Sequence, residues 1–124
     1  MAEKFDAVIL MCSQDTIKTY APGITVSSSG AMTQADRVRA ISTLFADYFP
    51  QNAVDQWAKS GVILSYVDMK QPLPHNIAEG IARQDAFNSG VSAERLKKAS
   101  IHGLDSKRTD RNHPAYLIMF TTKE

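Results

Sequence analysis

Three short runs of the chain are apolar almost throughout, and they constrain the fold more than any other feature of the sequence. They cover residues 5–11, 62–67 and 116–120 and are rich in valine, isoleucine, leucine and aromatic residues. Apolar runs of this length without strict alternation are typical of strands that are covered on both faces. We therefore expect these three segments to form a sheet that is buried between other elements.

A weaker apolar alternation over residues 17–26 predicts a bent or hairpin-like segment of the same sheet. It carries Ile17, Tyr20, Ile24 and Val26. Pro22 interrupts it, and because proline cannot donate a ladder hydrogen bond, the segment is expected near an edge.

Two helices are expected after this segment. The first begins at Thr33, whose hydroxyl can cap the free amides while Asp36 follows three residues later, and it is expected to stop at Pro50. The second is expected from about Asn52 to Gly61 and buries Val54 and Trp57. We expect Trp57 to lie largely buried against the sheet, because it has the largest side chain on the apolar side of that helix.

Two more helices are expected after the middle apolar run. The spacing of isoleucine and alanine over residues 77–86 predicts a third helix, which Asn88-Ser89-Gly90 ends. Ser92 opens a fourth helix, which is expected to close at Gly103.

This order of elements predicts a small α+β domain, with an α/β arrangement as the alternative. We expect a single globular domain over residues 1–124, with a sheet of about four strands and helices packed on one or both faces. The lone Cys12 cannot form an internal disulfide, which favours a reducing, cytoplasmic setting. No secretory signal is recognised, and no apolar stretch approaches the roughly 20 residues that span a bilayer, so no membrane partner is expected.

The formal charge of +1 conceals an uneven distribution along the chain. Residues 1–94 hold seven Lys/Arg against ten Asp/Glu, and residues 95–124 hold seven against three. Most of the excess lies within seventeen residues, at Arg95, Lys97, Lys98, Lys107, Arg108 and Arg111, with His102 and His113 beside them. A concentrated cationic segment is the usual electrostatic sign of an anionic partner.

The polar segment 105–114 is the main candidate for that contact. Arg108 and Arg111 can each offer a planar fork of donors to phosphate oxygens, and Lys107 can add charge. The predicted ligand-binding residues are Lys97, Lys98, Lys107, Arg108, Arg111 and His113. The alternative is a solvated surface loop whose cations are partly neutralised by its own Asp105 and Asp110.

Other motifs have weaker support. Residues 85–96 superficially resemble a helix-turn-helix, although Asp85 and Ser89 stand where that motif has apolar residues, and an ordinary helical corner explains the pattern equally well. No histidine has ligand spacing to other metal-binding residues, so neither a metal nor a cofactor is expected. Cys12 follows a buried-looking strand, which favours an unreactive buried thiol over a nucleophile.

Together these features predict a small cytosolic binding protein that engages a phosphate-bearing partner, either nucleic acid or a nucleotide-like ligand. The cluster holds few cations, so one copy of the chain would bind nucleic acid weakly. Two copies would double the number of cations in contact, which predicts a homo-oligomer. One alternative is an enzyme acting on a phosphorylated or nucleotide-like substrate, in which Tyr66, Glu79 or His113 moves a proton; no catalytic residue is assigned. A further alternative is an inhibitor or accessory factor whose basic segment meets an acidic protein surface beside an exposed apolar patch.

Overall fold

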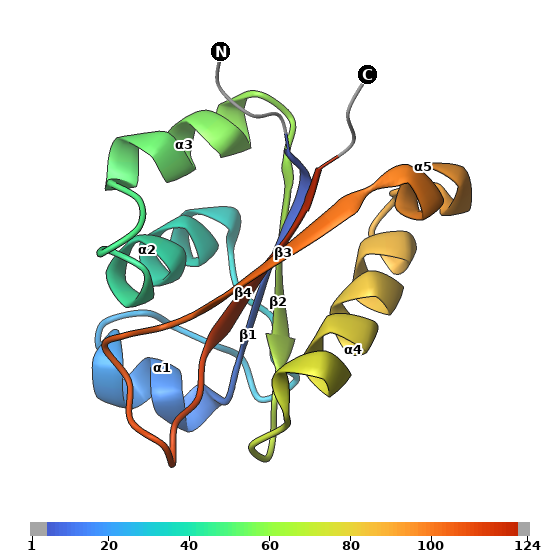
Figure 1. The fold of residues 1–124 in the computed structure, drawn as a ribbon. Coiled ribbons are helices and arrows are strands. Elements are labelled where there is room, and N and C mark those ends of the chain that lie inside the picture. Colours follow the sequence, from blue (N-terminus) through green and yellow to red (C-terminus); the bar gives the residue numbers. More distant parts are fainter. Residues whose placement is uncertain (1–4, 122–124) are drawn as a thin grey trace.

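The computed structural model describes residues 5–121 as a four-stranded mixed sheet with helices on both faces (Figure 1). The strands are β1 (Phe5–Cys12), β2 (Ile63–Asp68), β3 (Ser100–Asp105) and β4 (Tyr116–Thr121). Their order across the sheet is β2-β1-β4-β3. β1 and β2 are parallel, whereas β4 is antiparallel to both of its neighbours. The carboxyl ends of β1, β2 and β3 therefore lie at one edge of the sheet, together with the start of β4.

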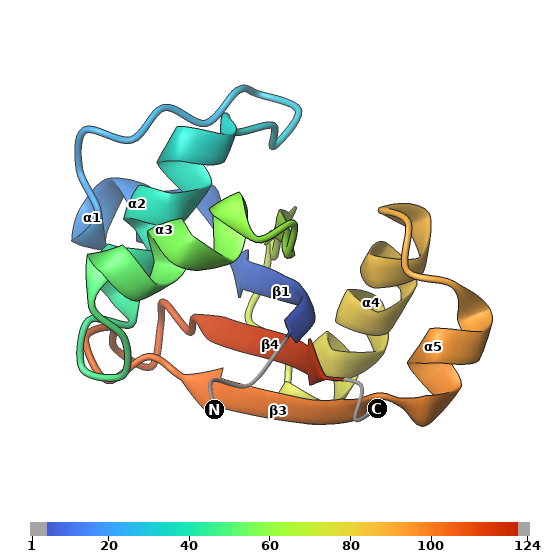
Figure 2. The ribbon, with the colours of Figure 1, turned by 90° about the horizontal axis from the view of Figure 1, so that it is seen from above.

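Five helices cover the two faces of this sheet, three on one side and two on the other (Figures 1 and 2). The first face carries α1 (Gln14–Tyr20), α2 (Gln34–Leu44) and α3 (Gln51–Lys59), and the second carries α4 (His75–Asn88) and α5 (Ala93–Lys98). Alternate side chains of β1 point to opposite faces, so Leu10 packs with α2 and Ile9 packs with α4. Burial on both faces explains why β1 is apolar without a break from Ala7 to Cys12.

The three apolar runs are confirmed as β1, β2 and β4, and the small α+β sheet with helices on both faces is confirmed as well. Two helix starts also agree with their sequence signals. Thr33 Oγ1 accepts a hydrogen bond from the backbone N–H of Asp36 at 3.1 Å, and Ser92 Oγ accepts one from Arg95 at 3.2 Å.

The prediction of a strand-like segment at residues 17–26 was wrong. Residues 14–20 form α1, because Ser13 Oγ caps it by accepting from the backbone N–H of Thr16 at 3.1 Å. Ile17 and Tyr20, three residues apart, follow the helical spacing that places side chains on one face.

Two helices are shorter than predicted. The helix that starts after Thr33 ends at Leu44, before Pro50 is reached, and residues 45–48 form a turn. α5 ends at Lys98, so residues 100–105 supply β3, the fourth strand of the sheet, which the sequence pattern had placed in a helix. β3 is an edge strand that buries little of itself, and its apolar signal is correspondingly weak.

Trp57 is half-buried, which corrects the expectation of a largely buried side chain. Its ring packs edge-to-face against Phe5 and Phe49, with centroids 5.2 and 4.8 Å apart. Trp57 therefore lies at the rim of the core that the sheet forms with α1, α2 and α3. Across residues 5–121, no helix is long and apolar enough to cross a membrane.

Candidate functional site at the carboxyl edge of the sheet

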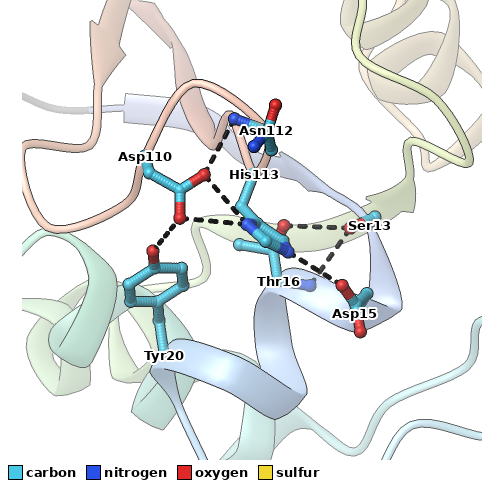
Figure 3. Close-up of polar contacts among 7 residues, drawn as sticks. All are labelled: Ser13, Asp15, Thr16, Tyr20, Asp110, Asn112 and His113. Carbon is cyan, nitrogen blue, oxygen red and sulfur yellow. Dashed lines mark hydrogen bonds and ion pairs between the residues drawn. The ribbon is translucent and has the colours of Figure 1, made fainter.

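His113 occupies the centre of a polar cluster at the carboxyl edge of the sheet (Figure 3). It lies in the loop that joins β3 to β4, and this loop crosses over α1. Its Nε2 is 2.8 Å from Oδ2 of Asp15, near the start of α1, and its Nδ1 is 3.0 Å from Oδ1 of Asp110. The histidine thus joins α1 to its own loop.

Asp110 collects several hydrogen bonds besides the one from His113. The Tyr20 hydroxyl donates to Oδ2, and the backbone N–H of Asn112 donates to Oδ1 at 2.8 Å. The hydroxyl of Tyr20, followed by the ring of His113, lowers the pKa of Asp110 to about 2. The same contact raises the pKa of Tyr20. Asp110 is therefore a fixed negative charge near neutral pH.

The cluster favours the protonated form of His113. A neutral imidazole has one N–H, but both ring nitrogens face a carboxylate that can only accept, so both are satisfied in the imidazolium. The hydrogen bonds to Asp110 and then to Asp15 raise the pKa of His113. Both N–H groups of the imidazolium are thus engaged by carboxylates, and its positive charge offsets part of theirs at the carboxyl edge of the sheet.

A cavity of about 190 Å³ opens beside His113. Its walls come from three segments: Ser13 and Asp15 after β1, residues 69–72 after β2, and residues 112–114 before β4. Lys70 supplies the second cation among the lining residues. Ligands of open sheets that contain parallel strands bind outside the carboxyl ends of those strands, which is where this cavity lies.

Ser13 is held by the start of α1. Its Oγ accepts from the backbone of Thr16 and lies 2.9 Å from the Thr16 hydroxyl. Neither ring nitrogen of His113 hydrogen-bonds to this hydroxyl, because they face Asp110 and Asp15. The site therefore lacks the contact between nucleophile and base that activates serine. Ser13 can still offer a hydrogen bond to a group in the cavity.

The basic loop residues are placed separately. Lys107 Nζ lies 5.3 Å from the centre of the Tyr48 ring, and Arg108 Nη2 is 3.5 Å from Oδ1 of Asp47. Both contacts direct these side chains toward the end of α2. Arg111 is exposed, precedes the cavity residue Asn112, and has no ion pair within residues 5–121.

The aspartates of the loop do not neutralise its arginines. Asp110 binds His113, and Asp105 accepts from Nδ1 of His75 at 2.9 Å. The loop is therefore neutralised in part, because Asp110 pairs with His113 of the same loop, whereas Arg111 has no ion pair within residues 5–121.

Lys97 and Lys98 do not join the loop cations. They lie on α5, which precedes β3, whereas Lys107 follows β3 at its other end. A six-residue strand spans roughly 20 Å, so the six predicted binding residues do not form a single patch. Only His113 lines the cavity, with Arg111 next to it in sequence.

His75 forms a second polar cluster at the same edge, between α4 and β3. Its Nε2 is 2.9 Å from Oε2 of Glu79, its Nδ1 faces Asp105, and its ring packs edge-to-face on Tyr116. In the described part of the chain, no group of three or more histidine, cysteine, aspartate or glutamate side chains is arranged to hold a metal ion.

Cys12 is fully buried at the end of β1. Burial raises the pKa of its thiol well above the ordinary range, which agrees with the expected unreactive side chain. The Tyr66 hydroxyl donates to the backbone carbonyl of Cys12 at 2.9 Å, so this tyrosine is also committed to the interior.

Sequence reasoning missed Asp15, Tyr20 and Lys70. Asp15 and Lys70 stand three and two residues after the ends of β1 and β2, and polar residues in that position are a usable signal once the two strands are known to be parallel. Tyr20 had no such signal, because its partner Asp110 comes from the distant loop.

Comparisons of this chain with protein-family models, with curated proteins and with solved structures found no significant match.

Proposed function

We propose that this protein binds a small phosphate-bearing ligand of the nucleotide-like class at the carboxyl edge of its sheet. The observation that carries this proposal is the cavity lined by His113, whose two carboxylate partners favour its cationic form, together with Lys70. Lys70 and the donors of Asn112 and Ser13 match the oxygens of a phosphate group, while the charge of His113 offsets the Asp15 carboxylate that also lines the cavity.

The size of the cavity limits what it can hold. At about 190 Å³ it is smaller than the roughly 300–1,000 Å³ of most small-molecule sites, so it suits a phosphate group better than a whole nucleotide. The remainder of the ligand would extend over the exposed loop, where Arg111 is available.

A small ligand is favoured over nucleic acid by the placement of the cations. Nucleic acid is bound along a continuous basic face, whereas here Lys97 and Lys98 are separated from the loop by the length of β3. The cytosolic setting predicted from Cys12 is part of this proposal, and the homo-oligomer stays a prediction.

A second candidate function is hydrolysis of a phosphate ester. The raised pKa of His113 favours it, because a protonated histidine can act as a general acid. In that reaction the oxygen of a water molecule forms a new bond to phosphorus and that water gives up one proton to solvent. The bond to the leaving group breaks, and the leaving oxygen takes a proton from His113, which solvent then replaces. Release of phosphate from nucleoside monophosphates separates this candidate from binding alone.

Calorimetric titration with pyrophosphate and with adenosine diphosphate at about pH 6 tests the binding proposal. We expect His113→Gln and Lys70→Gln each to weaken binding by at least about tenfold, or about 1.4 kcal/mol. Lys98→Gln is the matched control on α5 and should leave the affinity unchanged. The proposal is overturned if neither probe binds, or if all three variants bind like the wild type.

A further inference from the structure

The outward side of α4 carries three large apolar side chains among its polar residues. α4 packs against the sheet through Ala78, Ala82 and Ala86. Its other side exposes Ile77, Ile81 and Phe87, which are 48%, 38% and 50% accessible and are the exposed large apolar side chains of the described chain. Exposed apolar residues gathered on one element mark an interaction site more often than scattered ones do.

A hollow of about 300 Å³ lies between this face and α5. Gly80 and Phe87 of α4 and Leu96 of α5 line it. Gly80 is in the interior of the helix, where glycine costs stability, and a Cβ built on it would meet nothing within 4 Å. No contact within the described residues therefore requires a glycine here, and its effect is to keep the hollow open.

The charged residues of the hollow are both positive. Arg83 lies on its α4 side and Lys97 on its α5 side, and neither has an ion-pair partner among residues 5–121. Their neighbours differ, since Lys98 lies 3.5 Å from Glu94 and Arg95 lies 2.7 Å from Asp6. The apolar residues of the hollow, Gly80, Phe87 and Leu96, are therefore flanked on two sides by cations that have no ion pair within residues 5–121.

We infer that the α4–α5 hollow docks an acidic amphipathic segment of a partner protein. One apolar side chain of the partner enters beside Gly80, Phe87 and Leu96, and its carboxylates meet Arg83 and Lys97. This is the recognition mode in which an amphipathic helix lies in an apolar groove. The inference is independent of the proposed ligand site, because α5 and the loop lie at opposite ends of β3.

Two other occupants fit the observations less well. A symmetric contact with a second copy would place Arg83 and Lys97 against their own equivalents, and like charges repel. An anionic membrane matches the charge and the exposed Ile77 and Ile81, but it cannot reach Leu96, which is buried in the wall of the hollow.

Selection from a phage-displayed library of random 16-residue peptides on the immobilised protein tests this inference. We expect enrichment of peptides in which leucine or phenylalanine alternates with Asp/Glu at helical spacing. Synthetic versions of these peptides should lose at least about tenfold in affinity, measured by fluorescence anisotropy, with Arg83→Glu/Lys97→Glu. Lys59→Glu, the same charge reversal on α3, should leave the affinity unchanged.

Gly80→Leu is the decisive second variant. A Cβ at this position meets nothing within 4 Å and leucine is a good helix former, so the melting temperature should not fall. The added side chain should occupy the hollow, so peptide binding should be lost. The inference is overturned if no acidic apolar peptides are enriched, or if the enriched peptides bind these variants as tightly as the wild type. It is also overturned if phosphatidylserine vesicles bind in place of peptides. Light scattering that shows a dimer dissociated by Gly80→Leu would assign the surface to a second copy instead.

Discussion

At the scale of single residues, the protonation of one imidazole ring determines how α1 is held to the loop before β4. His113 faces Asp15 on one side and Asp110 on the other, and only the imidazolium donates to both. The cluster is partly exposed, so its effect on stability is modest and screened by salt. Its effect on the shape of the cavity is direct, because His113 and Asp15 are both lining residues.

We expect this cluster to make stability depend on pH. The pKa of His113 is raised, so its contribution is fully present below about pH 6.5 and is lost as the pH rises through the folded-state pKa. The pKa of Asp110 is lowered to about 2, so its contribution is present above about pH 4 and is lost as the pH falls toward 2. The difference in melting temperature between the wild type and His113→Gln should therefore be largest between about pH 4 and 6.5. A difference that is constant from acid to alkaline pH would contradict this assignment.

Part of this residue-level picture could be predicted from the sequence. The sequence named His113 and Arg111 as candidates because they lie in a polar, cationic loop between predicted elements, and the structure places His113 in the wall of the cavity. Asp15 and Tyr20 were not, because the pairing of β1 with β4 brings them to the loop, and no local pattern reveals which strands pair. Lys70 was missed for the same reason.

At the scale of elements, β1 and β3 differ in whether the sequence predicts them, because one is a central strand and the other an edge strand. β1 is central and packed on both faces, so its six fully buried positions, residues 7–12, all require apolar side chains. β3 is an edge strand with exposed Ser100, His102 and Asp105. The predicted cap at Ser92 is confirmed. No local sequence signal marks the end of α5 at Lys98, so the sequence pattern predicted a helix that continues to Gly103.

Gly103 reveals how closely β3 approaches α4. A Cβ at this position would lie 2.1 Å from Nε2 of His75, whose ring is held by Asp105, Glu79 and Tyr116. We expect Gly103→Ala to lower the free energy of unfolding by about 1–3 kcal/mol, as overpacking does, measured by urea denaturation. Because the clash is with one ring, Gly103→Ala in a His75→Ala background should cost much less. Equal costs in the two backgrounds would assign the effect to the backbone of β3.

At the scale of the whole molecule, the fold brings the basic residues of the C-terminal part next to acidic residues of the N-terminal part. Arg95 pairs with Asp6, Arg108 with Asp47 and His113 with Asp15, so cations of the final third meet acids of the first half. The linear asymmetry was therefore a correct observation about composition, but the three-dimensional distribution could not be read from it. Near the cavity, Arg111 is the loop arginine that has no ion pair within residues 5–121 and can contact a ligand.

This distribution predicts different roles for the two arginines. Arg111→Gln should weaken pyrophosphate binding by at least about tenfold and make the salt dependence of the affinity shallower by about one unit. Arg108→Gln should change the affinity little, because its side chain faces Asp47, and neither variant should shift the melting temperature by more than a degree or so. Titrations at several salt concentrations measure both effects. Equal losses in the two variants would mean that the ligand spans the whole loop.

The position of β4 also sets the order in which the molecule can be assembled. β4 is the last strand along the described chain, yet it lies between β1 and β3 and pairs Phe5 with Thr121. During synthesis β1, β2 and the three helices between them emerge first and can associate, whereas β3 has no neighbour in the sheet until β4 has left the ribosome. The late, long-range insertion of one strand therefore completes both faces of the sheet, and topologies that depend on such distant pairings fold slowly.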